Sequence, residues 1–405
     1  MSHEGLSSGR NAQSERVWRR RTLKVARRTG YTVIALFVAL WAFTISVRYP
    51  NPVMSYRLGF AAASKTVELQ ASRPIKATTA AMTFGKVNEP MPADVVWRDQ
   101  PMTFERFLKT TSTNAFVVVR NGNIAYEYYA DGVQPSQKLP SYSVAKSVVG
   151  MLAWQQIEAG TLKLDTKFVD LFPELKASDQ FNKITLRHLL EMSGGLAAND
   201  DYPSGPSGWG RPIAQMFATT DMMYFLGKHR DMRGDPGTIH EYHSIDAQLA
   251  GMMVSKAAGK PLSELVQTKI FAPMGAEFDA SWTLDRNGGW EKSFCCLNMA
   301  ARDYARLGQV LVNNGTGAHG KVLGEKAMNA VLKPTLPEFS DDKWGYGAFV
   351  WHPHPDALAF TGLHEQLVVV LPATQTVVVK LSDAVEGHNA ESVEVMYQIA
   401  KTAAL

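Results

Sequence analysis

Cysteine is nearly absent from this chain of 405 residues, which contains two cysteines side by side, Cys295 and Cys296. Such a count excludes a disulfide scaffold and a zinc site built from four cysteines. Neighbouring cysteines rarely pair with each other, because the geometry of such a bond is strained. We therefore expect two small buried residues here rather than a bond.

A large excess of charge is also missing. The formal net charge is +4, and 45% hydrophobic and 20% charged residues are typical of a globular protein. Much of the positive charge lies before residue 30, and the rest of the chain is slightly acidic, so we expect no nucleic-acid partner. The early basic residues are Arg10, Arg16, Arg19, Arg20, Arg21, Lys24, Arg27 and Arg28.

An uncharged apolar run, YTVIALFVALWAFTISV, occupies residues 31–47. Its length is at the lower limit for a membrane-spanning helix. The preceding arginines place the N-terminus in the cytoplasm by the positive-inside rule. A cleaved signal peptide is the alternative, but Arg48-Tyr49-Pro50 is a poor cleavage site. We expect a single-pass anchor in the inner membrane, with the body of the protein on the periplasmic side.

The expected domains are a cytoplasmic basic tail (1–30), the transmembrane anchor (31–47), a stem (48–100) and a folded domain (101–405). The stem is rich in Ala, Pro, Thr and Met and has no clear periodicity. In the folded domain, Asn121-Gly122 lies between two β-prone runs, which predicts a tight hairpin.

Helical patterns dominate a middle region of about 160–335, and β-prone runs return near the C-terminus before a last helix. These runs predict an α/β (α+β) fold in which both ends of the chain form one antiparallel sheet, flanked by helices, with a helical region inserted. We expect a cleft where the insertion meets the sheet. The clearest helices cover 147–159, 184–196, 244–260 and 299–315, and the later strands lie within 345–353, 357–372 and 374–382.

Ser143 and Lys146 open the apolar helix as Ser-Val-Ala-Lys. A helix N-terminus offers free N–H groups to the oxygen of an attacked carbonyl. A lysine one turn later lies on the same face and can accept the serine proton if burial lowers its pKa. A capping serine with an exposed lysine is the structural alternative. A second match, Ser340 to Lys343, lies in an acidic turn and predicts nothing.

Other catalytic signatures are weaker or missing. No G-x-S-x-G elbow is present, which argues against an α/β-hydrolase. His352-Pro353-His354-Pro355-Asp356 imitates a metal-binding pattern, but two prolines stiffen it and no histidine follows the aspartate. We expect neither a metal nor a cofactor.

Residues 140–175 and 184–196 resemble the serine β-lactamase-related family, the class C β-lactamase and D-alanyl-D-alanine carboxypeptidase group. The resemblance covers most of residues 110–400 and implies the β-lactamase/transpeptidase-like fold. That family carries a Tyr-x-Asn or Tyr-x-Ser motif about a hundred residues after its serine, and Tyr242-His243-Ser244 fits. The resemblance implies that Tyr242 accepts or relays the serine proton, with the charge of Lys146 lowering its pKa.

The third family motif, Lys-Thr-Gly or His-Thr-Gly, is replaced by Phe360-Thr361-Gly362. A subgroup similar to 6-aminohexanoate-dimer hydrolases and related esterases varies at the same place and reads Gly-x-x-Gly-Gln, which this chain matches except for Glu365. We expect His364 to lie on the strand of Phe360, on the same face, where it could replace the missing cation. The implied substrate-binding residues are Tyr202, Ser244, Gly362, His364 and Gln366.

The resemblance thus implies a membrane-anchored serine hydrolase that cleaves a small amide or ester through an acyl-enzyme on Ser143. The oxyanion would bind the Ser143 N–H and a second N–H near Gln366. The alternative is a penicillin-binding sensor on the same fold that is acylated but does not turn over. Esters, linear amides, β-lactams and D-Ala-D-Ala peptides all stay open as substrates, and the sequence does not indicate an oligomeric state.

Overall fold

The structure, a computed structural model, describes residues 7–87, 89–201, 211–384 and 389–402. The chain divides into two compact units, residues 1–59 and 60–405, and each is described by itself. The first unit contains helix α1 (Ser7–Ser46), in which residues 16–46 are long and apolar enough to cross a membrane. The basic segment and the apolar run form one helix, because only Gly30 interrupts the helix-forming residues between them.

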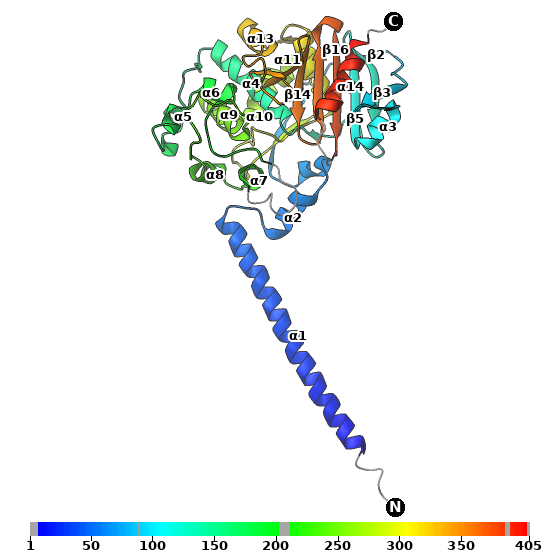
Figure 1. The fold of residues 1–405 in the computed structure, drawn as a ribbon, viewed down its shortest axis with the longest axis vertical. Coiled ribbons are helices and arrows are strands. Elements are labelled where there is room, and N and C mark those ends of the chain that lie inside the picture. The colour runs from blue at the N-terminus through cyan, green and yellow to red at the C-terminus, as the bar shows by residue number, and fades with distance from the viewer. Residues whose placement is uncertain (1–6, 88, 202–210, 385–388, 403–405) are drawn as a thin grey trace, which may run out of the picture. The chain divides into compact units, whose positions relative to one another are not determined.

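The second unit is built on an eight-stranded sheet, which confirms that strands from both ends of the folded domain join (Figure 1). Neighbouring strands are antiparallel except β2 and β6, which are parallel. Asn121 and Gly122 both have positive φ and close the predicted hairpin. In spatial order the strands are β12 (Gly345–Gly347), β13 (Val350–His354), β14 (Ala357–Gly362), β15 (Gln366–Leu371), β16 (Thr376–Ser382), β5 (Thr113–Arg120), β6 (Asn123–Tyr129) and β2 (Gly85–Lys86).

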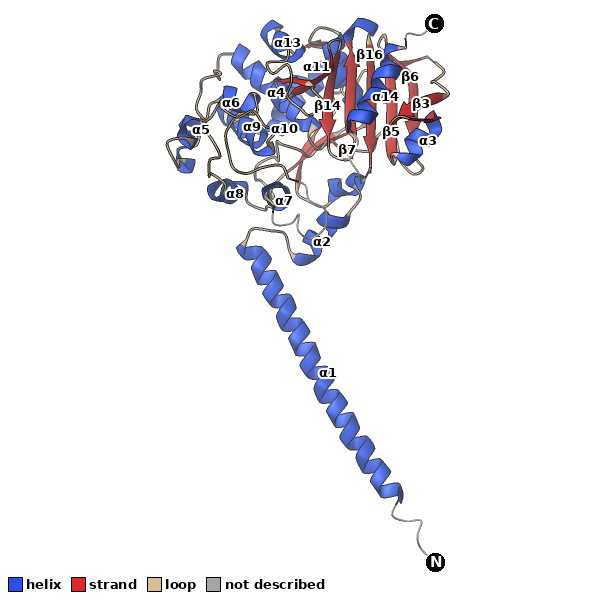
Figure 2. Cartoon of the chain, viewed as in Figure 1, coloured by secondary structure: helices blue, strands red, loops and turns tan. Residues whose placement is uncertain are grey.

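Both faces of this sheet are apolar and covered. Along β16, Val377 and Val379 belong to the larger core, whereas Val378 belongs to a smaller core on the other face. Helices α3 (Phe104–Thr110) and α14 (Asn389–Lys401) contribute to the smaller core, and Figure 2 shows α14 lying across the strands.

The larger core packs the sheet against the helical region, which includes α4 (Val144–Glu158), α9 (Ser244–Ala258) and α12 (Ala301–Val312). The remaining helices of this region are short. They are α5 (Phe168–Leu171), α6 (Leu186–Leu190), α7 (Pro212–Ala218), α8 (Met222–Lys228), α10 (Leu262–Val266), α11 (Ala272–Met274) and α13 (Glu325–Leu332).

A second, four-stranded sheet has the order β1 (Ser72–Ile75), β8 (Ala280–Thr283), β9 (Leu297–Met299) and β7 (Leu139–Pro140). Strand β1 lies in the segment expected to be a stem, yet Ile75 is fully buried, so part of that segment belongs to the folded body. The sequence hid this strand because Pro74 interrupts it, which an edge strand tolerates. Two small hairpins complete the fold, β3 (Asp94–Trp97) with β4 (Gln100–Thr103) and β10 (Thr316–Gly317) with β11 (Gly320–Lys321).

Candidate active site

The chain reaches Ser143 through a tight turn between β7 and α4. Ser141 anchors the turn, because its N–H donates to the Leu297 carbonyl (2.9 Å) and its Oγ accepts from the Leu297 N–H (3.0 Å). Tyr142 has a φ of 42°, a left-handed conformation that is costly for a residue with a side chain. Ser143 therefore stands at the N-terminus of α4, and no residue in the described part of the chain accepts a hydrogen bond from its N–H.

Lys146 lies one helical turn beyond Ser143 and is buried. Its Nζ donates to Ser143 Oγ (2.7 Å) and to the Phe294 carbonyl (3.0 Å). Burial lowers the pKa of Lys146 from 10.5 to about 7, against the opposing charge of Asp200. The capping alternative does not occur, since Ser143 Oγ accepts nothing from the helix backbone. Near neutral pH the amine is partly neutral and within proton-transfer distance of the serine oxygen.

Tyr242 completes the group around Ser143. Its hydroxyl hydrogen-bonds with Ser143, and Lys146 Nζ lies 4.8 Å from the centre of its ring. The expectation that Lys146 lowers the pKa of Tyr242 is wrong: burial raises that pKa well above its usual range, and the bond to Ser143 offsets only part of the rise. The phenol is therefore neutral, which suits a proton relay better than a base.

Asp200 supports this group from the loop before α7. Its carboxylate accepts from the Ser244 N–H (2.8 Å) and the Ser244 hydroxyl (2.5 Å), at the first turn of α9. Its charge also raises the pKa of both Lys146 and Tyr242. Ser244 is thus occupied in holding Asp200. Asp200 was not among the site residues expected from the sequence, and Tyr202, which was, lies outside the described residues.

Gly362, the last residue of β14, lies against the turn that carries Ser143. A Cβ at this position would lie 2.5 Å from the Ser141 carbonyl oxygen and 3.0 Å from Ser143 N, so a side chain does not fit. Phe360, two residues earlier, is fully buried in the larger core. It therefore offers no group to a substrate anion, and the strand end at Gly362 is the part of β14 beside the nucleophile.

His364 and Gln366 are placed differently from the expectation. Strand β14 ends at Gly362, and His364 lies in the following turn with a φ of 61°, so it does not share a strand face with Phe360. Its Nδ1 hydrogen-bonds with the Ala384 carbonyl (2.6 Å), and its ring lies 5.0 Å from that of Tyr142. The buried Gln366 donates to the carbonyls of His364 (2.9 Å) and Ser382 (2.6 Å), so its side chain holds the turn.

Glu365 occupies the position at which the resembling subgroup carries glycine, and its φ of 56° explains why glycine suits that position. The Glu365 carboxylate accepts from Lys380 Nζ (2.7 Å) and from the Ser392 hydroxyl (2.7 Å). Lys380 is fully buried and Glu365 almost so. A buried ion pair thus holds the turn that follows Gly362.

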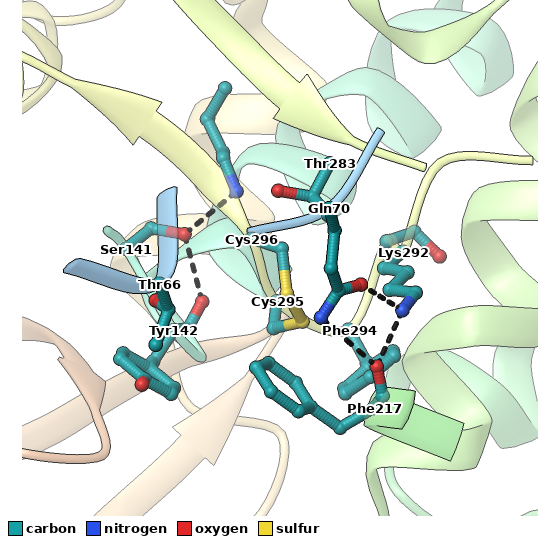
Figure 3. The surroundings of a disulfide bond; sticks show 12 residues. Thr66, Gln70, Ser141, Tyr142, Phe217, Thr283, Lys292, Phe294, Cys295 and Cys296 are labelled. Atoms are coloured by element: carbon teal, nitrogen blue, oxygen red, sulfur yellow. Dashed lines mark hydrogen bonds between the residues drawn. A yellow bond between two sulfur atoms is a disulfide. The ribbon is translucent and has the colours of Figure 1, made fainter. Parts of the chain in front are cut away.

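Cys295 and Cys296 are joined by a disulfide, which corrects the expectation of an unbonded pair, although both residues are buried as expected. Figure 3 shows the bond between Ser141 and Tyr142 on one side and Gln70 and Lys292 on the other. The bond directly follows Phe294, whose carbonyl binds Lys146, and precedes Leu297, which binds Ser141. The sequence could not show this juxtaposition, because β8 and β9 gave no strand signal.

Two weaker sequence signals have local roles. Lys343 donates its N–H to the Ser340 carbonyl (2.8 Å) within a turn, so this second Ser-x-x-Lys match opens no helix. His354 pairs with Glu394 (2.9 Å), while Asp356 binds the Tyr397 hydroxyl (3.0 Å). Within the described residues, no three His, Cys, Asp or Glu side chains are grouped as metal ligands.

The chain is similar to known proteins in sequence and in fold. The family model described as Beta-lactamase matches residues 103–398. The 6-aminohexanoate-dimer hydrolase of Paenarthrobacter ureafaciens is 26% identical over 342 residues, which cover 74% of this chain and 84% of that protein. A β-lactamase of Escherichia coli is 28% identical over 135 residues, 33% of this chain and 32% of the relative.

Solved structures share the fold. A candidate 6-aminohexanoate-dimer hydrolase from Bacillus anthracis superposes with a TM-score of 0.74 at 21% identity, covering 87% of this chain and 94% of the other. The hydrolase EstCE1, which has promiscuous acyltransferase activity, gives a TM-score of 0.57 at 16% identity over 73% of this chain and 96% of its own.

Proposed function

Given that this chain belongs to the Beta-lactamase family of serine hydrolases, we propose that it cleaves a small amide or ester through an acyl-enzyme on Ser143. One observation carries the proposal. Lys146 Nζ lies 2.7 Å from Ser143 Oγ, and burial brings the pKa of this amine to about 7. A lysine with such a pKa serves as a general base at neutral pH.

The chemistry follows from the contacts. Neutral Lys146 accepts the Ser143 proton while Oγ attacks the substrate carbonyl carbon. The resulting oxyanion accepts a hydrogen bond from the Ser143 N–H and a second one from a backbone N–H of the cleft strand near Gln366. Tyr242, neutral and hydrogen-bonded to Ser143, relays a proton to the leaving group. Water then attacks the carbonyl carbon of the acyl-enzyme. The same two residues take up the proton of the water and return a proton to Ser143 Oγ, which releases the acid product.

The direct test is Ser143→Ala, assayed with a nitrophenyl ester and with a fluorophosphonate probe. We expect turnover and covalent labelling both to disappear, whereas Ser340→Ala, the matched serine of the second motif, leaves both unchanged. Labelling of Ser143→Ala at the wild-type level would refute the assignment. The sensor alternative predicts at most one equivalent of product per chain, so the number of turnovers separates it from an enzyme.

For the substrate, we favour uncharged esters or linear amides over β-lactams. A cation in place of Phe360 would make a charge-assisted hydrogen bond to a substrate carboxylate, an interaction of roughly 1.5–3 kcal/mol. Its absence corresponds to about a tenfold to hundredfold loss in affinity for such substrates. We expect a nitrophenyl ester to have the higher kcat/KM when compared with a chromogenic cephalosporin, and the reverse order would contradict this preference. Repeating the pair with His364→Ala tests whether His364 replaces the missing cation.

We also propose that α1 anchors the enzyme in the inner membrane, with the catalytic unit on the periplasmic side. The support is the length and apolar composition of residues 16–46 and the arginines before residue 30.

A further inference from the structure

The disulfide-bonded pair lies in a segment that contacts Lys146 and the turn that carries Ser143. Phe294, before the pair, accepts the hydrogen bond of Lys146 Nζ (3.0 Å). Leu297, after it, exchanges two hydrogen bonds with Ser141, two residues before Ser143. A change in the backbone conformation between Phe294 and Leu297 would therefore alter the hydrogen bond of the Lys146 amine and the hydrogen bonds that hold the turn before Ser143.

The backbone of the pair is in a conformation that needs support. Cys296 has a φ of 73°, in the left-handed region that residues with a side chain rarely adopt. The bond between the adjacent side chains closes a small ring around their common peptide and so restricts this φ. Without the bond, Cys296 can relax toward negative φ, which turns the peptide and displaces the Phe294 carbonyl from Lys146.

We propose that the Cys295–Cys296 disulfide is a redox-modified positioning site for Lys146, and that its reduction switches the hydrolase to a low-activity state. The inference rests on the proposed function of Ser143 and Lys146. Reduction by a dithiol breaks the one S–S bond, transfers two electrons and two protons to give two cysteine thiols, and leaves the reductant as its own disulfide. Reoxidation restores the bond and the activity.

The two sulfur atoms are nearly inaccessible to a reductant in solution. We therefore expect the disulfide to be reduced only under prolonged reducing conditions. Cys295 is 3% and Cys296 7% exposed. Cys296 borders a cavity of about 10 Å³, lined also by Tyr142, Phe217 and Asn298, which is too small for a thiol reductant. Exchange therefore needs a local opening of the segment, which makes reduction slow in the native state.

The test uses the full-length wild-type protein, treated with excess dithiol under native conditions until mass spectrometry shows the gain of two hydrogens. We expect kcat for an ester to fall at least tenfold with a smaller change in KM, and to recover on reoxidation. The acid limb of the kcat/KM profile should also move to lower pH than in the oxidised enzyme. The Phe294 carbonyl stabilises the charged amine, so its displacement lowers the pKa of Lys146. A bond that only stabilises the fold would change the melting temperature without moving this limb.

Two matched variants test the backbone explanation. Cys295→Ala/Cys296→Ala lacks the bond and should resemble the reduced enzyme. Cys295→Ala/Cys296→Gly also lacks it, but glycine adopts a φ of 73° without strain, so activity should return and ignore dithiol. Equal wild-type activity in both variants would overturn the proposal.

Other outcomes are equally decisive. If the disulfide of the native protein is still intact after prolonged treatment with excess dithiol, the proposal of a switch is overturned. Unchanged kcat in a fully reduced protein that still labels at Ser143 would overturn it and leave the proposed function standing. Absence of Ser143 labelling in both redox states would overturn the two together.

Discussion

In the proposed mechanism, the ionisation of Lys146 sets the pH range in which the site is active. As a base it must be neutral, so we expect kcat/KM to rise with pH through about 7 and then level off. Lys146→Met should lower kcat by about 100- to 10,000-fold. Lys292 is the control, since burial lowers its pKa to about 7 as well, but it binds Gln70 and the Phe217 carbonyl instead of Ser143. If Lys292→Met removed the limb near pH 7 and Lys146→Met did not, the roles would be reversed.

Glu365 and Lys380 form a buried ion pair, so we expect the loss of either residue to destabilise the protein more than the loss of both. Glu365→Gly would relieve the positive φ but leave Lys380 buried without its partner, so we expect a loss of about 3–5 kcal/mol in the free energy of unfolding. Lys380→Met should cost a similar amount, because it leaves the carboxylate unpaired. The double variant should be more stable than either single one. Urea unfolding of the wild type, the two single variants and the double variant gives the four free energies of this double-mutant cycle. If the free-energy losses of the single variants add up to that of the double variant, the two residues do not interact.

Residue patterns predicted the catalytic group better than its surroundings. Ser143, Lys146 and Tyr242 carry local motifs with a characteristic spacing, and the structure brings them together. The Phe294 carbonyl is a backbone group, and no sequence pattern marks which carbonyl a lysine will bind. The prediction that His364 lies on a strand is wrong because a turn follows Gly362. The positive φ values of this turn are at His364 and Glu365, which are not glycine, so the sequence does not reveal the turn.

At the scale of elements, the close approach of β14 to the start of α4 forms the site. Gly362→Ala should push the strand end away from the Ser143 turn, because its Cβ would lie 2.5 Å from the Ser141 carbonyl. We expect ester turnover and fluorophosphonate labelling to fall at least tenfold. Gly227→Ala in α8 is the control: nothing lies within 4 Å of its Cβ, and alanine favours a helix by about 1 kcal/mol. Wild-type labelling of Gly362→Ala would contradict the proposed contact.

Strong periodicity decided which elements could be predicted. The hairpin at residues 121–122, helix α9 and the C-terminal strands were expected and are present. Strands β1, β8 and β9 were not, since each has at most four residues and the sheet they form is held by pairing between distant segments. Short strands of this kind are specified by their partners rather than by their own sequence.

For the whole molecule, the orientation of the anchor can be tested directly. If the proposed orientation holds, protease added to intact spheroplasts should digest the catalytic unit and leave a short N-terminal fragment protected, because the positive-inside rule assigns the end with the arginines before residue 30 to the cytoplasm. An antibody to an N-terminal tag detects the fragment, and a cytoplasmic protein that stays intact is the control. A catalytic unit that resists until the membrane is broken would show the opposite orientation.

The pairing of β5 with β16 also dictates when the protein can fold during its synthesis. Arg120 and Thr376 lie opposite each other although 256 residues separate them in the chain. During synthesis, the edge of β5 that pairs with β16 stays unpaired until residues 376–382 have been translated, and unpaired strand edges promote aggregation. A stop codon before residue 376 therefore removes a strand from the middle of the sheet, and with it Val377 and Val379 of the larger core.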